Sequence, residues 1–204
     1  MSQLSENKMT GLTTKGKKTR QKILDTAEQI FGEKGYFETS VAEITLTAGV
    51  AQGTYYNYFP TKKAVFEELI KQLSSDFRYE IKVAMEKEQS FETKQKAGYQ
   101  AFFEWLVNHR NLYSIIQQSV LVDIELYRWY YEKIAEGFIK SIDKAIQEGE
   151  CKPLSAETVA YCLMGIGQFI GMRWVYWEEE SVPEVVFDEV MEIIFKGLNH
   201  KLEG

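Results

Sequence analysis

Residues 40–62 read SVAEITLTAGVAQGTYYNYFPTK, and this stretch decides how the N-terminal part of the chain folds. Ser40 and Glu43 have the spacing of a capping box, in which a hydroxyl and a carboxylate satisfy free amides at the start of a helix. One apolar edge follows at helical spacing, formed by Val41, Ile44 and Ala48. Gly49 stands at the stop, where a left-handed backbone favours glycine. The stretch therefore predicts a short helix that ends in a tight turn.

A second short helix is predicted over residues 52–58. A helix of this length is marginal alone in water, so neighbouring elements must hold it. Val50, Tyr55 and Phe59 can pack inward, while the side chains with polar tips remain available to a partner: Gln52, Thr54, Tyr56, Asn57 and Tyr58. Two such helices joined by a turn are typical of a helix-turn-helix, whose second helix lies in the major groove of DNA.

The available side chains suit the two kinds of DNA contact. Gln52 and Asn57 can pair bidentately with adenine, although either could be a solvated polar residue. Tyr56 and Tyr58 suit phosphate contacts, against the alternative that tyrosines are amphipathic residues at the edge of a core. Lys62, at the start of the next helix, can hold a phosphate together with free amides. The full set of candidate DNA contacts is Thr39, Ser40, Gln52, Gly53, Thr54, Tyr56, Asn57, Tyr58 and Lys62.

At these positions the chain resembles the TetR family of bacterial transcriptional repressors, whose pattern is approximately T-x-x-x-I-x-x-x-A-G-V-S-x-G-T-x-Y-x-H-F-x-x-K. The matching residues are Ser40, Ile44, Ala48, Gly49, Val50, Gly53, Thr54, Tyr56, Phe59 and Lys62. The resemblance extends to the preceding helix through Ile23, Ala27, Phe31 and Gly35. Ala51 and Tyr58 depart from the pattern, where the family often has a capping serine and a histidine. These departures concern individual phosphate contacts and leave the expected fold unchanged.

Composition and periodicity indicate an all-α protein. The chain has 204 residues, of which 45% are hydrophobic and 26% charged, and only three are prolines. Long stretches with a 3.6-residue period leave little room for a sheet. Nine helices are expected. Capping residues and the 3.6-residue period place them at about residues 18–34, 40–48, 52–58, 61–87, 90–108, 111–122, 123–148, 153–177 and 181–198, with Ser90, Asn111 and Ser155 among the residues at their starts. The resemblance implies that three of them form the DNA-binding domain and six a regulatory domain. We divide the chain into a flexible arm (1–16), a helix-turn-helix domain (17–60) and an effector-binding and dimerisation domain (61–204).

The charge is unevenly distributed between these parts. Residues 1–63 hold nine Lys or Arg against six acidic residues, a net charge of +3, whereas residues 64–204 hold 15 against 24, a net charge of −9. Such asymmetry would attract the N-terminal part to phosphates and repel the remainder. The start of the chain lacks the apolar segment of a signal peptide, so we expect a cytoplasmic protein.

Residues 159–177 are almost continuously apolar and approach the length of a membrane span. Gln168, Arg173 and the acidic residues on both sides argue against membrane insertion. A helix that is apolar all round is buried on every side, which favours a partner chain. The resemblance likewise implies a homodimer formed through the last two helices. Three glycines could admit a second helix or bulky neighbours of the same subunit: Gly165, Gly167 and Gly171.

The second domain is rich in aromatic residues and lacks a catalytic constellation. His109 and His200 are isolated, so neither an enzyme nor a metal site is expected, and no cofactor is implied. Most aromatic residues should fill the core or the dimer interface, and some should line an apolar cavity. The candidate ligand-binding residues are Tyr99, Phe103, Gln118, Tyr131, Phe138, Gln168, Met172 and Arg173. A buried Arg173 would need an anion, which could be Asp123, Glu125 or the ligand.

These observations predict a homodimeric repressor that binds a pseudo-palindromic operator in double-stranded DNA and is released by a small apolar effector. The runs LYRWYYEKI and LMGIGQFIGMRWV resemble regulators of lipid metabolism within the family. The alternative is a carrier of hydrophobic ligands, or a dimeric interaction module, that does not bind specific DNA.

Overall fold

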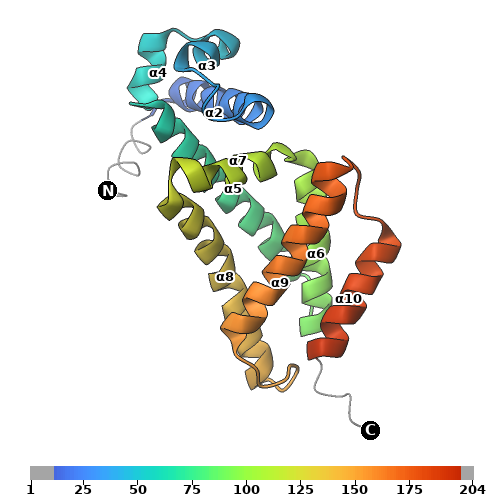
Figure 1. Cartoon of the computed structure of the whole chain (residues 1–204). Coiled ribbons are helices and arrows are strands. Elements are labelled where there is room, and N and C mark those ends of the chain that lie inside the picture. The colour runs from blue at the N-terminus through green and yellow to red at the C-terminus, as the bar shows by residue number, and fades with distance from the viewer. Residues whose placement is uncertain (1–11, 199–204) are drawn as a thin grey trace.

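The computed structural model describes residues 12–198, which form nine α-helices and one π-helical turn without a strand (Figure 1). The prediction of an all-α fold is confirmed. The elements are α2 (Thr14–Lys34), α3 (Val41–Ala48), α4 (Gln52–Tyr58), α5 (Lys62–Met85), α6 (Phe91–Asn108), α7 (Asn111–Val122), α8 (Ile124–Gln147), α9 (Ala156–Gly171), η1 (Met172–Trp177) and α10 (Glu184–Leu198).

Side-chain caps fix many of the helix starts. The Ser40 hydroxyl accepts a hydrogen bond from the Glu43 amide at 3.1 Å, as the sequence predicts. Glu43 does not complete the capping box, because its carboxylate pairs with Lys34. Gly49 has φ 61° and ψ 39°, the left-handed conformation expected at the end of α3. The same kind of cap begins α5, α6, α8 and α9, at Thr61, Ser90, Asp123 and Ser155.

The helices form a small and a large bundle that share one long helix (Figure 1). Helices α2, α3 and α4 pack together at one end, around fully buried Phe31, Ile44 and Tyr55. Helix α5 begins beside them and continues into the larger bundle, where it packs along α6, while α8 packs along α9. Helix α7 lies across the end of the larger bundle and contacts α2. Helix α10 stands at the outer side of α6 and α9.

Three boundaries differ from the sequence prediction. The expected flexible arm lies largely outside the described residues, but residues 14–16 already belong to α2. Asn111, predicted to cap a helix, makes no cap; its side chain fills the space where a Cβ on Gly32 would lie, 2.2 Å from Asn111 Cγ. Helix α9 ends at Gly171, where the chain changes to π-helix, whereas one helix was expected to continue to about Trp177.

Candidate DNA-binding surface and ligand cavity

One buried aromatic side chain, Tyr55, packs helix α4 against the rest of the small bundle. Tyr55 is fully buried, its ring lies 5.8 Å from that of Phe59, and its hydroxyl donates to the Thr61 carbonyl at 3.2 Å. Gln52, Gly53, Tyr56 and Asn57 are exposed, whereas Thr54 and Tyr58 are half-buried. The helix therefore presents a polar, solvent-exposed side on a rigid support, which is the geometry a recognition helix needs.

The residues that flank α4 have more structural roles than the sequence suggested. Lys62 Nζ donates to the carbonyls of Tyr36 and Thr39 at 2.6 and 2.7 Å and lies 4.3 Å from the centre of the Tyr36 ring. Burial lowers the pKa of Lys62. Because an ammonium group has three donors, one remains for a phosphate. Lys62 thus fastens the start of α5 to the segment between α2 and α3.

Thr39 and Ser40 are also engaged within the protein. Thr39 is 2% exposed and its hydroxyl donates to the Gly35 carbonyl at 2.6 Å, so this side chain is not presented to DNA as the sequence analysis expected. Thr39 was a candidate DNA contact because threonine is usually exposed, whereas here its side chain supports the turn after α2. Ser40 is exposed, and its hydroxyl caps α3.

An apolar cavity of about 70 Å³ lies between α5, α6, α8 and α9. Its lining comprises Phe77, Ile81, Met85, Gln95, Gly98, Tyr99, Phe102, Tyr130, Tyr131, Ile134, Phe138, Leu163, Met164, Gly167 and Gln168. None of these residues carries a formal charge at neutral pH, and burial raises the pKa values of Tyr99, Tyr130 and Tyr131 above the usual range, which keeps their hydroxyls neutral. The cavity suits an apolar, uncharged group.

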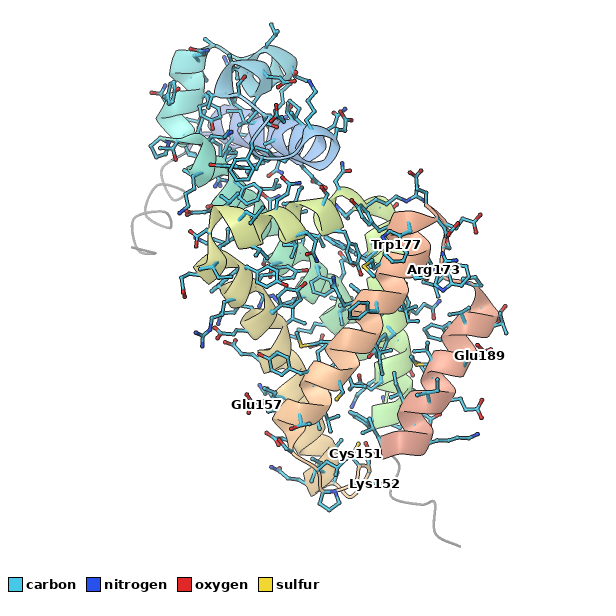
Figure 2. All side chains as sticks on the ribbon, viewed as in Figure 1. Cys151, Lys152, Glu157, Arg173, Trp177 and Glu189 are labelled. Carbon is cyan, nitrogen blue, oxygen red and sulfur yellow. The ribbon has the colours of Figure 1, made fainter. Side chains whose placement is uncertain are left out.

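Four of the eight candidate ligand residues line this cavity: Tyr99, Tyr131, Phe138 and Gln168. The other four lie elsewhere. Phe103 is buried and borders a groove between α6 and α10, and Met172 packs on the core within η1. Gln118 binds the end of α2. Arg173 is exposed beyond the end of α9, where it pairs with Glu178 (Figure 2).

Arg173 therefore needs neither a buried carboxylate nor a ligand, and Asp123 pairs instead with Lys63 at 2.7 Å. The helical period itself accounts for this position. At 3.6 residues per turn, Arg173 follows the cavity residue Gln168 by five residues and therefore lies on another side of the helix.

Sequence reasoning missed the contribution of α5 and the beginning of α6 to the cavity. Phe77, Ile81 and Met85 looked like ordinary core residues of a long helix. Gln95 could have been noticed, because it interrupts the apolar stripe that runs from Phe91 to Tyr99 at four-residue intervals.

Two elements connect the cavity to the DNA-binding end. Helix α5 lines the cavity near its C-terminus and supports α2 near its N-terminus, where the Phe66 and Phe31 rings lie 5.2 Å apart. Helix α7 contacts both sides as well. The Tyr113 hydroxyl donates to the carbonyl of cavity residue Gln168. One turn further, Gln118 donates to the Phe31 carbonyl at 3.2 Å and accepts from the Tyr36 amide.

Known proteins share both the local motif and the whole fold. The profile described as "Bacterial regulatory proteins, tetR family" matches residues 23–69, which span most of α2, all of α3 and α4, and the first part of α5. The fatty acid metabolism regulator protein of Bacillus subtilis (strain 168) is 24% identical over 184 residues, covering 88% of this chain and 95% of that protein.

Solved structures agree with the present fold. The crystal structure of the transcriptional regulator FadR from Bacillus subtilis in complex with stearoyl-CoA has a TM-score of 0.78 at 22% identity, over 87% of this chain and 98% of that one. The fatty acid degradation regulator FadR from Bacillus halodurans has a TM-score of 0.79 at 22% identity, over 88% and 95%. No described helix meets the length and hydropathy needed to cross a membrane. The segment of residues 23–69 is therefore similar to the DNA-binding segment of the tetR family of bacterial regulatory proteins, and the fold of the whole chain is similar to that of the regulators named above.

Proposed function

We propose that this protein is a homodimeric repressor whose two α4 helices enter successive major grooves of a pseudo-palindromic operator, and that an apolar effector in the cavity releases it. Two-fold symmetry would place the recognition helices about 34–36 Å apart on consecutive grooves. The exposed polar residues of α4 would contact the DNA, with Gln52 and Asn57 at base edges and Tyr56 and Tyr58 at phosphates. Such a protein would act in the cytoplasm, where the bacterial chromosome lies.

The outer faces of α9 and α10 support the dimer. Val185 and Ile193 on α10 are 64% and 67% exposed, and Tyr161 and Phe169 on α9 are also exposed. A largely apolar groove runs between these two helices. Within the subunit Gly167 and Gly171 already accommodate bulky neighbours: Tyr99 and Phe102 at Gly167, Leu106 and Tyr113 at Gly171. A second copy covering α9 and α10 would bury the exposed apolar residues.

The cavity supports an effector of the acyl type. Its lining is aromatic, aliphatic and uncharged. The similar regulator from Bacillus subtilis was crystallised with stearoyl-CoA, a long apolar chain attached to a polar carrier. We therefore propose residues 61–204 as the effector-binding and dimerisation domain, and 17–60 as the DNA-binding domain.

The observation that carries the proposal is the double role of α5, which lines the cavity with Phe77, Ile81 and Met85 and supports the DNA-binding domain through Phe66. A ligand that displaces the C-terminal part of α5, which lines the cavity, would also move its N-terminal part, which supports the DNA-binding domain. An effector shifts the equilibrium only by its differential affinity for the two conformations, so a hundredfold loss of operator affinity needs about 2.7 kcal/mol.

The test is an anisotropy titration of the full chain on labelled DNA from its own upstream region, with and without acyl-CoA thioesters of increasing chain length. We expect specific binding at physiological salt that one range of chain lengths abolishes, and unlabelled DNA of scrambled sequence should compete poorly. Weak retention that is indifferent to sequence would instead identify a carrier of hydrophobic ligands.

A further inference from the structure

One buried polar group in the cavity wall has no partner. Gln95 is 2% exposed, and its Nε2 atom makes no hydrogen bond to any described residue. Leaving a buried amide unpaired costs about 1–3 kcal/mol, and buried polar groups in proteins are nearly always paired. A glutamine in this position therefore destabilises the empty protein unless something else supplies the missing acceptor.

The residues beside Gln95 on α6 do not supply the missing acceptor, so we look for it in the cavity. Gly98, one turn further along α6, faces Met85 and Ile81 of α5 so closely that an added Cβ would lie 3.2 Å from Met85 Cγ. The Tyr99 hydroxyl, the next polar group on this face, donates to the Leu163 carbonyl at 2.7 Å, and its oxygen accepts no hydrogen bond from Gln95 Nε2. Gln95, Gly98 and Tyr99 all line the cavity.

We propose that Gln95 is the polar anchor of this cavity and donates a hydrogen bond to an uncharged oxygen of an otherwise apolar ligand. The inference rests on the proposed function, because it assumes that the cavity holds the effector. The acceptor belongs to a ketone, ester, thioester or alcohol. An ionised head group would meet no cation among the lining residues, and an unpaired charge is far more costly to bury than a carbonyl.

The position of Gln95 also sets the direction of the ligand. Gly98, one turn from Gln95 on α6, faces Met85, the last residue of α5, so Gln95 lies at the end of the cavity remote from α2, α3 and α4. The apolar part of the ligand then extends towards Phe77 and Gln168. A cavity of about 70 Å³ has room for roughly five water-sized groups, so a longer chain must displace flexible lining side chains such as those of Met85 and Met164.

The test compares two probes of equal shape, 2-hexanone and 2-methyl-1-hexene, which differ in a carbonyl against a methylene group. Binding is followed in the full-length protein by NMR of ¹³C-methyl methionine, because Met85 and Met164 line the cavity and report its occupancy directly. We expect the ketone to bind about tenfold more tightly than the alkene. In Gln95→Leu this preference should disappear, and the alkene should bind at least as tightly as in the wild type.

Gln100→Leu is the matched control, since Gln100 is an exposed glutamine on the same helix whose amide donates to Glu104. It should retain the tenfold preference. Equal binding of both probes to the wild type would overturn the role of Gln95 and leave an apolar effector site in place. Absence of any shift at Met85 and Met164 with either probe would overturn the effector site itself and the inference with it.

Unfolding by urea gives a second measurement that needs no ligand. Replacing an unpaired buried amide by leucine of similar size should raise the midpoint of the unliganded Gln95→Leu protein above that of the wild type. A lowered midpoint would show that the amide has a partner inside the protein, and the anchor role would then be wrong.

Discussion

At the scale of single residues, the DNA-binding surface depends on side chains that DNA would not touch. Lys62 binds two carbonyls of the segment between α2 and α3, Thr39 binds Gly35, and Tyr55 supports α4 from below. These contacts fix the orientation of α4. One contact typical of such helices is absent: Ala51 precedes α4 and provides no side-chain cap.

Ala51→Ser should therefore stabilise the protein. A serine hydroxyl at this position can accept a hydrogen bond from a free amide of the first turn, and a good N-cap contributes about 0.5–2 kcal/mol. Urea unfolding followed by circular dichroism measures the change. Ala42→Ser, an exposed position inside α3, serves as the control and should lower stability slightly because serine is a poorer helix former than alanine. Equal effects of the two substitutions would contradict the capping argument.

Lys62→Ala should weaken binding to every DNA sequence and reduce the salt dependence of log K by about one unit, because one phosphate contact is lost. Anisotropy titrations between 50 and 200 mM salt measure both quantities. The companion change Gln52→Ala should relax sequence preference and leave the salt slope unchanged, since an amide at a base edge displaces no counterion. An unchanged slope in Lys62→Ala would confine that lysine to its contacts with Tyr36 and Thr39.

At the scale of elements, α7 is a second connection between the cavity and the DNA-binding domain. Its Tyr113 contacts α9 at Gln168, and its Gln118 contacts both the Phe31 carbonyl and the Tyr36 amide at the end of α2. Because the Gln118 side chain both donates and accepts hydrogen bonds at the turn after α2, it fixes that turn against α7. Gln118 thus belongs to the interface between the domains and not to the cavity.

Gln118→Ala should reduce the effect of the effector on operator affinity by about tenfold while leaving effector binding unchanged, because the turn after α2 is no longer held to α7. Operator titrations with and without effector measure this coupling, and methionine NMR measures occupancy of the cavity. Gln117→Ala, an exposed neighbour on the same helix, is the control and should change neither. Full coupling in Gln118→Ala would leave α5 as the sole connection.

The elements themselves could largely be predicted from the sequence, and the cavity could not. Capping residues such as Ser40, Ser90 and Ser155 and the glycine at position 49 signal helix boundaries locally, so the predicted helix starts agree with the structure to within a few residues. Which aromatic residues meet in a cavity depends on how four helices pack: Tyr99 lines the cavity, whereas Phe103, one turn further along α6, borders the groove beside α10. The π-helical turn that begins at Met172 has no comparable local signal, so the sequence extends α9 too far.

At the scale of the whole molecule, the charge asymmetry and the apolar outer helices give the protein two distinct ends. The N-terminal 63 residues carry a net charge of +3 and the remainder −9. The exposed apolar residues of α9 and α10 lie on the acidic part. A dimer joined there would direct both basic ends to the same DNA and keep its acidic surface away from phosphates.

Ile193→Glu should shift the protein from dimer to monomer, because it places a charge in the proposed interface without disturbing the subunit core. Sedimentation velocity measures the mass, and the labelling rate of exposed Cys162 in the groove between α9 and α10 should rise as the partner leaves. Burial raises the pKa of the Cys151 thiol to about 11, so Cys151 should react slowly throughout. Tyr79→Glu changes an equally exposed residue on α5 and should leave the mass unaltered. If the Ile193→Glu protein remained dimeric, the outer face of α9 and α10 would not be the dimer interface.

The unbroken length of α5 has a mechanical consequence. At 1.5 Å per residue, the 19 residues between Ile81 in the cavity wall and Lys62 beneath the DNA-binding domain correspond to a rigid arm of about 28 Å. A tilt of about 6° at the cavity would displace the far end of that arm by about 3 Å, close to the rise of one base pair, and two-fold symmetry could double the change in spacing. An effector that only rearranges a few side chains around Ile81 could therefore move the recognition helices out of register with the operator.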